Sequence, residues 1–144
     1  MMLLDVKKQV ASPEISQLLE FAVYPDEEAL SKAIQRYERE EDLELYALKD
    51  EDELIGIIGF QIDEERALTI THLAISPEHR DQGYGRGIIL EVLYAKEPER
   101  IIAETDEDAV DFYRSIGFEI VSLGRLDHGV ERFRCTYETE PQED

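Results

Sequence analysis

The chain has 144 residues, 42% of them hydrophobic, and a formal net charge of −20 at pH 7. This length predicts a single domain, which we place at residues 1–138, followed by a short acidic tail at 139–144. The acidic surplus argues against nucleic acid as a partner, because its phosphates would be repelled. No apolar run approaches the ~20 residues of a membrane span, and the N-terminus lacks the apolar core of a signal peptide, so no membrane partner is expected.

Cysteine and histidine usage narrows the chemistry further. The single cysteine, Cys135, excludes an intramolecular disulfide and fits the reducing cytoplasm, which is the expected location. Cys135 lies in an alternating strand pattern, which favours a small buried residue over a nucleophile. The three histidines, His72, His79 and His128, show no metal-ligand spacing, so no metal is expected.

The first half of the chain predicts a strand, two helices and three further strands. Residues 2–8 form a weakly patterned strand. Ser12 and Pro13 predict the start of a helix, because Ser is a good N-cap and Pro suits the first turn. Pro25 predicts a second helix with one apolar stripe. An antiparallel meander of three strands then follows, at 43–48, 54–62 and 68–75.

The second half of the chain continues with a glycine-rich loop, a helix at about 83–96 and a short buried strand at 101–104. A helix between two strands implies that strands 68–75 and 101–104 are parallel.

Two further elements end the pattern. Thr105 and Asp108 predict the cap of a fourth helix, which stops at Gly117. Residues 118–123 and 130–137 then form a hairpin. Together these elements predict a mixed α/β sheet.

The glycine-rich loop carries the strongest functional signal. Its residues from Arg80 to Gly85 read Arg-x-x-Gly-x-Gly, between a strand and a helix. Glycines let the backbone turn tightly, so that consecutive N–H groups point at one anion. The helix start adds unpaired N–H groups and about half a positive charge. The loop therefore predicts a phosphate or pyrophosphate site.

Two other glycine-loop classes are excluded. No Lys-Ser or Lys-Thr pair follows the glycines, as a P-loop requires. The spacing of Gly83, Gly85 and Gly87 lacks the last step of the dinucleotide fingerprint, and the loop follows several strands rather than the first.

The loop resembles the acyl-CoA pyrophosphate loop, Arg/Gln-x-x-Gly-x-Gly/Ala, of the GNAT superfamily of N-acyltransferases. A second block, Asp106-x-x-Ala109-x-x-Phe112-Tyr113-x-x-x-Gly117-Phe118, is similar to the family's Asn-x-x-Ala-x-x-Phe/Leu-Tyr-x-x-x-Gly-Phe helix. The resemblance implies a GNAT-type mixed, mostly antiparallel sheet of about six to seven strands flanked by four helices, with a splayed central pair of parallel strands.

The same resemblance implies an N-acetyltransferase that passes an acetyl group from acetyl-CoA to a primary amine by direct attack. Backbone groups of Leu73, Ala74 and Ile75 would bind the pantetheine amides and polarise the thioester carbonyl. Asp106 stands where the family has an Asn that contacts the pantetheine arm. The pyrophosphate would be held by Arg80, Asp81, Gln82, Gly83, Tyr84, Gly85 and Arg86.

Roles in proton transfer follow less directly. Tyr113 is the expected general acid for the leaving thiolate. Many family members have a Glu on the strand before the loop, but this strand has none, so the candidate bases are His72, Glu104 or a chain of waters. Arg132 or Arg134, in the last strand, could bind an acceptor carboxylate, but pairing with some of the many acids is the favoured interpretation.

Two alternatives stay open. The missing strand Glu and Asp106 suggest an acyl-CoA-binding module without catalysis, and the acidic composition suggests an interaction scaffold that keeps the GNAT fold. For the enzyme, the expected acceptor is a small-molecule or peptide amine. Sheet edges in this family often support a homodimer.

Overall fold

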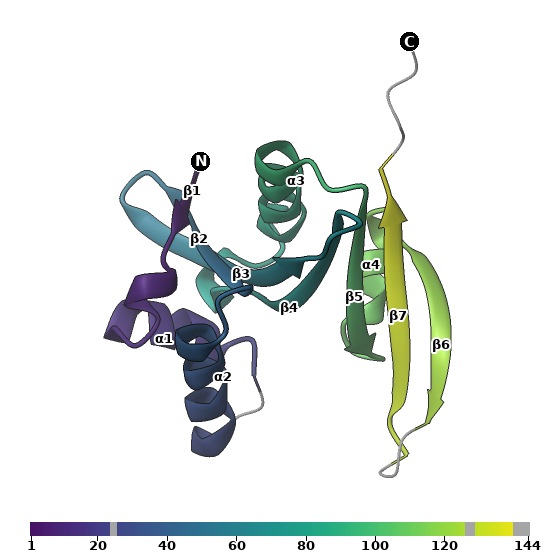
Figure 1. Ribbon diagram of the computed structural model, residues 1–144, viewed down its shortest axis with the longest axis horizontal. Helices are drawn as coiled ribbons and strands as arrows, with labels where there is room; N and C mark the ends of the chain where they lie inside the picture. Colours follow the sequence, from purple (N-terminus) through teal and green to yellow (C-terminus); the bar gives the residue numbers. More distant parts are fainter. Residues whose placement is uncertain (24–25, 126–128, 140–144) are drawn as a thin grey trace. The chain divides into compact units, whose positions relative to one another are not determined.

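The described residues form a seven-stranded sheet in the order β1-β2-β3-β4-β5-β7-β6 (Figure 1). The computed structural model describes residues 1–23, 26–125 and 129–139. The chain divides into two compact units. Unit 1 contains Met1–Gln61 and Thr71–Glu97, and unit 2 contains Ile62–Ile70 and the chain from Pro98 onward.

Unit 1 holds most of the N-terminal elements, with two helices on one face of its strands and a third helix on the other (Figure 1). Strand β4 begins in unit 2 and ends in unit 1. The elements are β1 (Met2–Asp5), η1 (Lys7–Gln9), α1 (Pro13–Glu20), α2 (Glu27–Arg39), β2 (Glu44–Asp50), β3 (Glu53–Ile62), β4 (Ala67–Ile75), η2 (Pro77–His79) and α3 (Tyr84–Lys96).

The starts of α1 and α2 follow local chemistry. Pro13 occupies the first turn of α1 after Ser12, as predicted. The N-cap of α2 is Asp26, whose Oδ1 accepts a hydrogen bond from the Glu28 N–H at 3.0 Å. The predicted opening residue, Pro25, lies outside the described residues. Asp26 was missed because a proline just before a helix is the more conspicuous signal.

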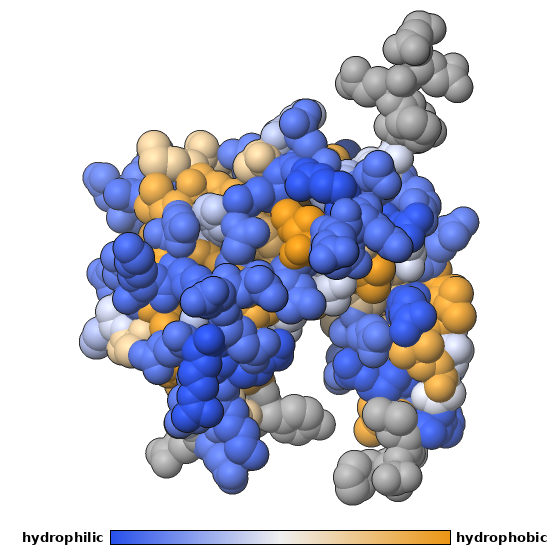
Figure 2. All heavy atoms as spheres, viewed as in Figure 1, coloured by the Kyte–Doolittle hydropathy of each residue, from blue (hydrophilic) through white to orange (hydrophobic). Residues whose placement is uncertain are grey.

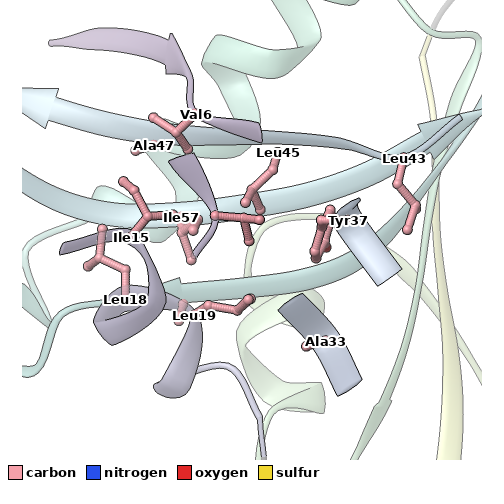
Figure 3. Packing of buried hydrophobic residues seen from close by; sticks show 12 residues of the cluster. Val6, Ile15, Leu18, Leu19, Ala33, Tyr37, Leu43, Leu45, Ala47 and Ile57 are labelled. Carbon is pink, nitrogen blue, oxygen red and sulfur yellow. The ribbon is translucent and has the colours of Figure 1, made fainter. Parts of the chain in front are cut away.

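The core of unit 1 is formed where α1 and α2 pack on β2 and β3 (Figure 3). Leu19, Tyr37 and Leu45 are completely buried there. Burial of a large apolar side chain stabilises the fold by about 1.5–3 kcal/mol, so this face fixes where α2 lies on the strands.

Unit 2 comprises β5 (Arg100–Asp106), α4 (Val110–Ser115), β6 (Glu119–Arg125) and β7 (Glu131–Glu138), with the first part of β4. The start of β4 is parallel to β5, with Ala67 opposite Arg100 and Thr69 opposite Ile102. Strands β5, β7 and β6 are antiparallel neighbours, and α4 packs on β6 and β7.

The predicted fold class is confirmed, including the parallel pair and the helices α1 to α4. The meander is confirmed as well. Asp63 N–H donates to the Ala67 carbonyl and Ser76 N–H donates to the Ile55 carbonyl, a pairing that only antiparallel neighbours make. Hydrophilic residues cover most of the face shown in Figure 2.

Two predicted boundaries are wrong. The first strand ends at Asp5 rather than residue 8, because the Asp5 carboxylate accepts the Lys7 N–H and turns the chain into η1. Thr105 does not cap the fourth helix, because β5 continues to Asp106. Asp106 Oδ1 instead accepts the N–H groups of Asp108 and Ala109.

The single-domain prediction, with its tail, stays a prediction. Residues 140–144 of that tail lie outside the described residues.

Candidate functional site

The loop between β4 and α3 has the backbone conformation of an anion site. Asp81 and Gly83 both have positive φ values, 62° and 83°. Such residues turn successive N–H groups toward the same side. Gly83 is the N-cap of α3, and a Cβ built on it would meet no atom of the described chain within 4 Å. The space beside Gly83 is therefore open.

The N–H groups of this loop are available to a ligand. The first bond of α3 runs from the Gly87 N–H to the Gly83 carbonyl, at 3.0 Å. Among the residues that the structure describes, no backbone N–H from Asp81 to Arg86 has a hydrogen-bond partner. Unpaired donors at a helix start, with the positive end of the helix dipole, are suited to a phosphate or pyrophosphate.

Side chains around the loop fix it from outside. Arg80 Nε donates to the Ile75 carbonyl at 3.1 Å, and Gln82 Nε2 donates to the Glu78 carbonyl at 3.4 Å. Tyr84 donates to Asp50 Oδ2 at 2.9 Å, and this bond is the main reason why the pKa of Tyr84 is raised. Arg86 is exposed, so its charge faces solvent beside the unpaired N–H groups.

The last residues of β4 lead directly into this loop. The parallel ladder between β4 and β5 ends at Thr69, while β4 continues to Ile75. Ala74 is buried, and Leu73 and Ile75 are half-buried. A Cβ on Gly56 of β3 would lie 2.8 Å from the Ala74 carbonyl oxygen, so β3 approaches this segment closely. The backbone of Ala74 and Ile75 therefore packs closely against β3, next to the loop between β4 and α3.

His72 precedes this segment and is part of a hydrogen-bonded group. Its Nδ1 lies 2.7 Å from the hydroxyl of Tyr37, which lies 2.6 Å from Thr71 Oγ1. Burial lowers the pKa of His72 to about 4, and the charge of Arg36 adds to the effect. His72 is therefore neutral at physiological pH.

Tyr113 lies in unit 2, within an aromatic cluster. Its ring packs edge to face on Phe112 and Phe118, and its side chain is buried. Burial raises the pKa of Tyr113, so the hydroxyl keeps its proton. Within the described chain this hydroxyl has no hydrogen-bond partner. It can therefore donate to another molecule.

The remaining acidic candidates are also in unit 2. Glu104 is exposed, and its Oε2 lies 3.4 Å from Arg134 Nη2. Arg134 thus pairs with an acid, the second of its two predicted roles. Asp106 uses Oδ1 to fix the turn before α4, which leaves Oδ2 for other contacts.

Cys135 is completely buried, opposite Ala103 on β5 and Ile120 on β6. Burial raises the pKa of its thiol, and a thiol without access to solvent is a poor nucleophile. Across residues 1–23, 26–125 and 129–139, no cluster of His, Cys, Asp and Glu has the arrangement of a metal site. His128, the third histidine for which no metal binding is expected, lies outside these ranges.

Sequence reasoning missed the polar contacts of Tyr37. Its position on the apolar stripe of α2 predicts only a core residue, and its polar partners are 34 and 35 residues further along the chain. One signal was available: Gly59 is one of two glycines in a largely apolar strand, and a glycine there is typical of a close approach by another group.

No helix in the described residues is long and apolar enough to cross a membrane.

Comparison with known proteins gives a family match. The model of the acetyltransferase (GNAT) family matches residues 13–118. A curated relative from Bacillus methanolicus, described as an uncharacterized N-acetyltransferase in the lysA 3′ region, is 36% identical over 64 residues. That segment is 44% of this chain and 53% of the relative, so the match spans about half of the relative's length.

Solved structures share the fold at low sequence identity. An aminoglycoside 6′-N-acetyltransferase complexed with coenzyme A aligns over 100% of both chains, with a TM-score of 0.78 and 17% identity. The ribosomal-protein-S18-alanine N-acetyltransferase from Escherichia coli aligns over 99% of this chain and 96% of its own, with a TM-score of 0.75 and 13% identity. A GNAT acetyltransferase from Elizabethkingia anophelis with bound acetyl-CoA covers 89% of this chain and 92% of its own, at a TM-score of 0.67 and 19% identity.

Proposed function

Since the chain belongs to the acetyltransferase (GNAT) family, we propose that it transfers an acetyl group from acetyl-CoA to a primary amine. The observation that carries this proposal is the run of unpaired N–H groups from Asp81 to Arg86 at the start of α3. Two solved structures with the same fold are described as complexes with coenzyme A or acetyl-CoA, which supports the choice of cosubstrate.

In this proposal the loop binds the pyrophosphate of the cosubstrate. The N–H groups supply the hydrogen bonds, and Arg80 and Arg86 add positive charge. The charges between residues 76 and 96 cancel, so the overall charge of −20 is not concentrated on the loop. An anion can therefore approach it despite the acidic composition.

The end of β4 would hold the pantetheine arm through backbone N–H and C=O groups of Leu73, Ala74 and Ile75. Acetyl-CoA supplies an activated thioester when bound. A backbone N–H aimed at the thioester oxygen stabilises the oxyanion, an effect worth about 3–4 kcal/mol in comparable sites. Asp106 is proposed as a further contact to the pantetheine, through the oxygen that the turn does not use.

Proton transfer completes the reaction. We assign Tyr113 as the donor to the leaving thiolate, because its hydroxyl keeps its proton and has no partner in the described chain. His72 is preferred over Glu104 as proton acceptor. It is neutral and lies on β4 next to Leu73, whereas Glu104 is exposed and already paired with Arg134.

Attack is direct, because the buried Cys135 cannot carry an acyl group. The acceptor is a small-molecule or peptide amine.

The first experiment is a calorimetric titration of the protein with acetyl-CoA, with ATP and desulfo-CoA as controls. Micromolar affinity for both coenzyme A compounds, without affinity for ATP, is the expected result. Thiol release is then measured with a panel of amines. Binding without thiol release from any amine would favour the non-catalytic acyl-CoA-binding module, and absence of binding would favour the interaction scaffold.

A further inference from the structure

The hydroxyl of Tyr37 lies where three elements of unit 1 meet. Figure 3 shows the Tyr37 side chain reaching from α2 toward the strands, among the buried apolar residues. Its oxygen is 2.6 Å from Thr71 Oγ1 and 2.7 Å from His72 Nδ1. A Cβ at Gly59 of β3 would lie only 1.7 Å from the same oxygen. Gly59 therefore leaves the space that the hydroxyl occupies.

These contacts distinguish the two nitrogens of the His72 ring. Nδ1 is engaged by Tyr37, whereas no group of the described chain bonds Nε2. The Tyr37 and His72 rings also pack against each other, with centroids 5.5 Å apart at an angle of 54°. The ring is thus fixed on one side, and Nε2 is the nitrogen left for another molecule.

Both groups are uncharged at physiological pH. Burial raises the pKa of Tyr37 to about 12 and lowers that of His72 to about 4. The charged neighbours are on α2, where Arg36 acts on both rings and is itself paired with Glu40 at 3.1 Å. The contacts from β3 and β4 come from the uncharged Gly59 and Thr71.

A phenol has one proton, so Tyr37 donates to at most one of its two neighbours, and any neighbour to which it does not donate must donate to it. When Tyr37 donates to Thr71, it accepts the Nδ1–H of His72, and Nε2 keeps a lone pair. In the reverse arrangement Nε2 carries the proton and cannot accept another. When His72 is protonated, both of its ring nitrogens carry a proton. Only in the first arrangement is the Tyr37 oxygen already placed to accept the Nδ1–H.

We propose that Tyr37 is a positioning residue, which holds the His72 ring through Nδ1–H so that Nε2 accepts the proton of the acceptor amine. This inference rests on the acetyltransferase function proposed above. His72 immediately precedes Leu73, the first residue proposed to bind the pantetheine, so both tasks lie on one strand of unit 1.

The step balances as follows. The nitrogen of the free amine forms a bond to the thioester carbon with its electron pair, and the π pair of the C=O bond moves onto the oxygen, which becomes an oxyanion. That nitrogen then carries a positive charge and becomes acidic enough to lose a proton to a weak base. The N–H bond breaks, its electron pair stays on nitrogen, and a new N–H bond forms at Nε2. The oxyanion then re-forms the C=O bond, the C–S bond breaks with its electron pair on sulfur, and the leaving thiolate takes a proton from Tyr113, the acid proposed above. The imidazolium donates through Nδ1 to Tyr37, and Nε2 later releases its proton to water, from which Tyr113 regains one.

Nitrogen NMR of the full chain, labelled with ¹⁵N-histidine, tests the positioning directly. The chain has three histidines, and a His72→Gln variant assigns the signals of His72. The wild-type ring should be neutral at pH 6, with its proton on Nδ1. In Tyr37→Phe, which keeps the packed ring and removes the hydroxyl, the two tautomers should mix. A proton on Nε2 in the wild type, or an unchanged tautomer in Tyr37→Phe, would overturn the proposal.

Steady-state kinetics, with an amine that the protein acetylates, test whether this positioning of His72 matters for the rate. Tyr37→Phe should lower kcat at least about tenfold, with little change in KM for acetyl-CoA, and should move the acid limb of the pH profile. Gly59→Ala should act in the same direction, because its methyl group displaces the hydroxyl. The matched control is Tyr46→Phe, which removes a hydroxyl bonded to Glu44 on β2.

The outcomes separate the two proposals. If the wild type releases no thiol with any amine, the proposed enzyme function fails, and the NMR result still decides how His72 is held. If the wild type is active and Tyr37→Phe has the kcat and pH profile of Tyr46→Phe, only the role of Tyr37 fails. Calorimetric titration with acetyl-CoA is the folding control, because a folded variant should bind acetyl-CoA with the affinity of the wild type.

Discussion

Single residues carry the proposed proton transfers, and burial sets their protonation states. Tyr113 and His72 are both removed from water, which favours the uncharged form of each. The effect raises the pKa of a phenol and lowers that of an imidazole. Desolvation thus leaves Tyr113 with its proton and His72 without a second one.

For Tyr113→Phe we expect kcat to fall while the affinity for acetyl-CoA stays nearly the same. The change removes a hydroxyl that has no partner in the described chain, so the free energy of unfolding should change by less than about 1 kcal/mol. Steady-state kinetics, calorimetry and denaturant unfolding measure the three quantities. An unchanged kcat would contradict the role of Tyr113 as an acid.

The lowered pKa of His72 predicts a pH dependence of folding. The unfolded chain binds a proton at its ordinary pKa of about 6.5, and the folded chain only near pH 4. The stabilisation is therefore complete above pH 6.5 and is lost as the pH falls toward 4, by roughly 2 kcal/mol after allowance for partial exposure.

Denaturant unfolding of the wild type and His72→Gln at several pH values measures this loss. The stability difference between the two proteins should shrink or reverse as the pH falls from 6.5 to 4. A difference that does not depend on pH would show that burial does not set the protonation of His72.

At the scale of elements, the start of α3 decides whether the loop binds an anion. Gly83→Ala forces a Cβ into a backbone with positive φ, at a cost of about 1 kcal/mol, yet the new methyl group would touch no described atom of the chain. If Gly83→Ala weakens acetyl-CoA binding by more than this strain accounts for, the new methyl group must clash with the bound acetyl-CoA.

Gly87→Ala is the matched control, because it lies in the same helix with its N–H already bonded to Gly83. Its Cβ would make only ordinary contact with Met1, at 3.5 Å. We expect calorimetry to show at least tenfold weaker binding for Gly83→Ala and near wild-type binding for Gly87→Ala. Equal affinities for the two variants would remove the loop assignment.

The start of α2 has a separate test. Asp26→Ala removes the acceptor of the Glu28 N–H and should lower the free energy of unfolding by about 1 kcal/mol. Tyr37 lies in the third turn of α2, far from the cap. Fraying of the first turn should therefore leave the Tyr37 contacts intact. Urea unfolding and the His72 NMR signals measure both effects; a displaced His72 signal would mean that the cap also controls the Tyr37 contact.

On the scale of the whole molecule, the net charge of −20 dominates the response to salt. Repulsion among the acids opposes folding at low ionic strength, where screening acts only beyond about 30 Å in 0.01 M salt. The exposed ion pairs, such as Lys32 with Glu28, contribute at most about 1 kcal/mol each. Repulsion should therefore outweigh attraction.

We expect the Tm to rise by several degrees between about 0.01 M and 0.15 M NaCl, where the screening length falls to about 8 Å. Differential scanning calorimetry in NaCl and KCl measures the change and controls for specific ion effects. A Tm that falls with added salt would mean that the ion pairs matter more than the net charge.

The sequence alone determined the order of elements, the parallel β4–β5 pair and the loop at Arg80–Arg86, because periodicity, caps and glycine spacing act over a few residues of chain. It predicted Thr105 instead of Asp106 for the turn before α4, because nothing in the sequence marks where β5 ends, and it could not determine that Tyr37 contacts His72. This contact joins residues 35 positions apart and depends on how α2 packs over Gly59. Such pairs are set by the packing of the core, and only the tertiary structure decides them.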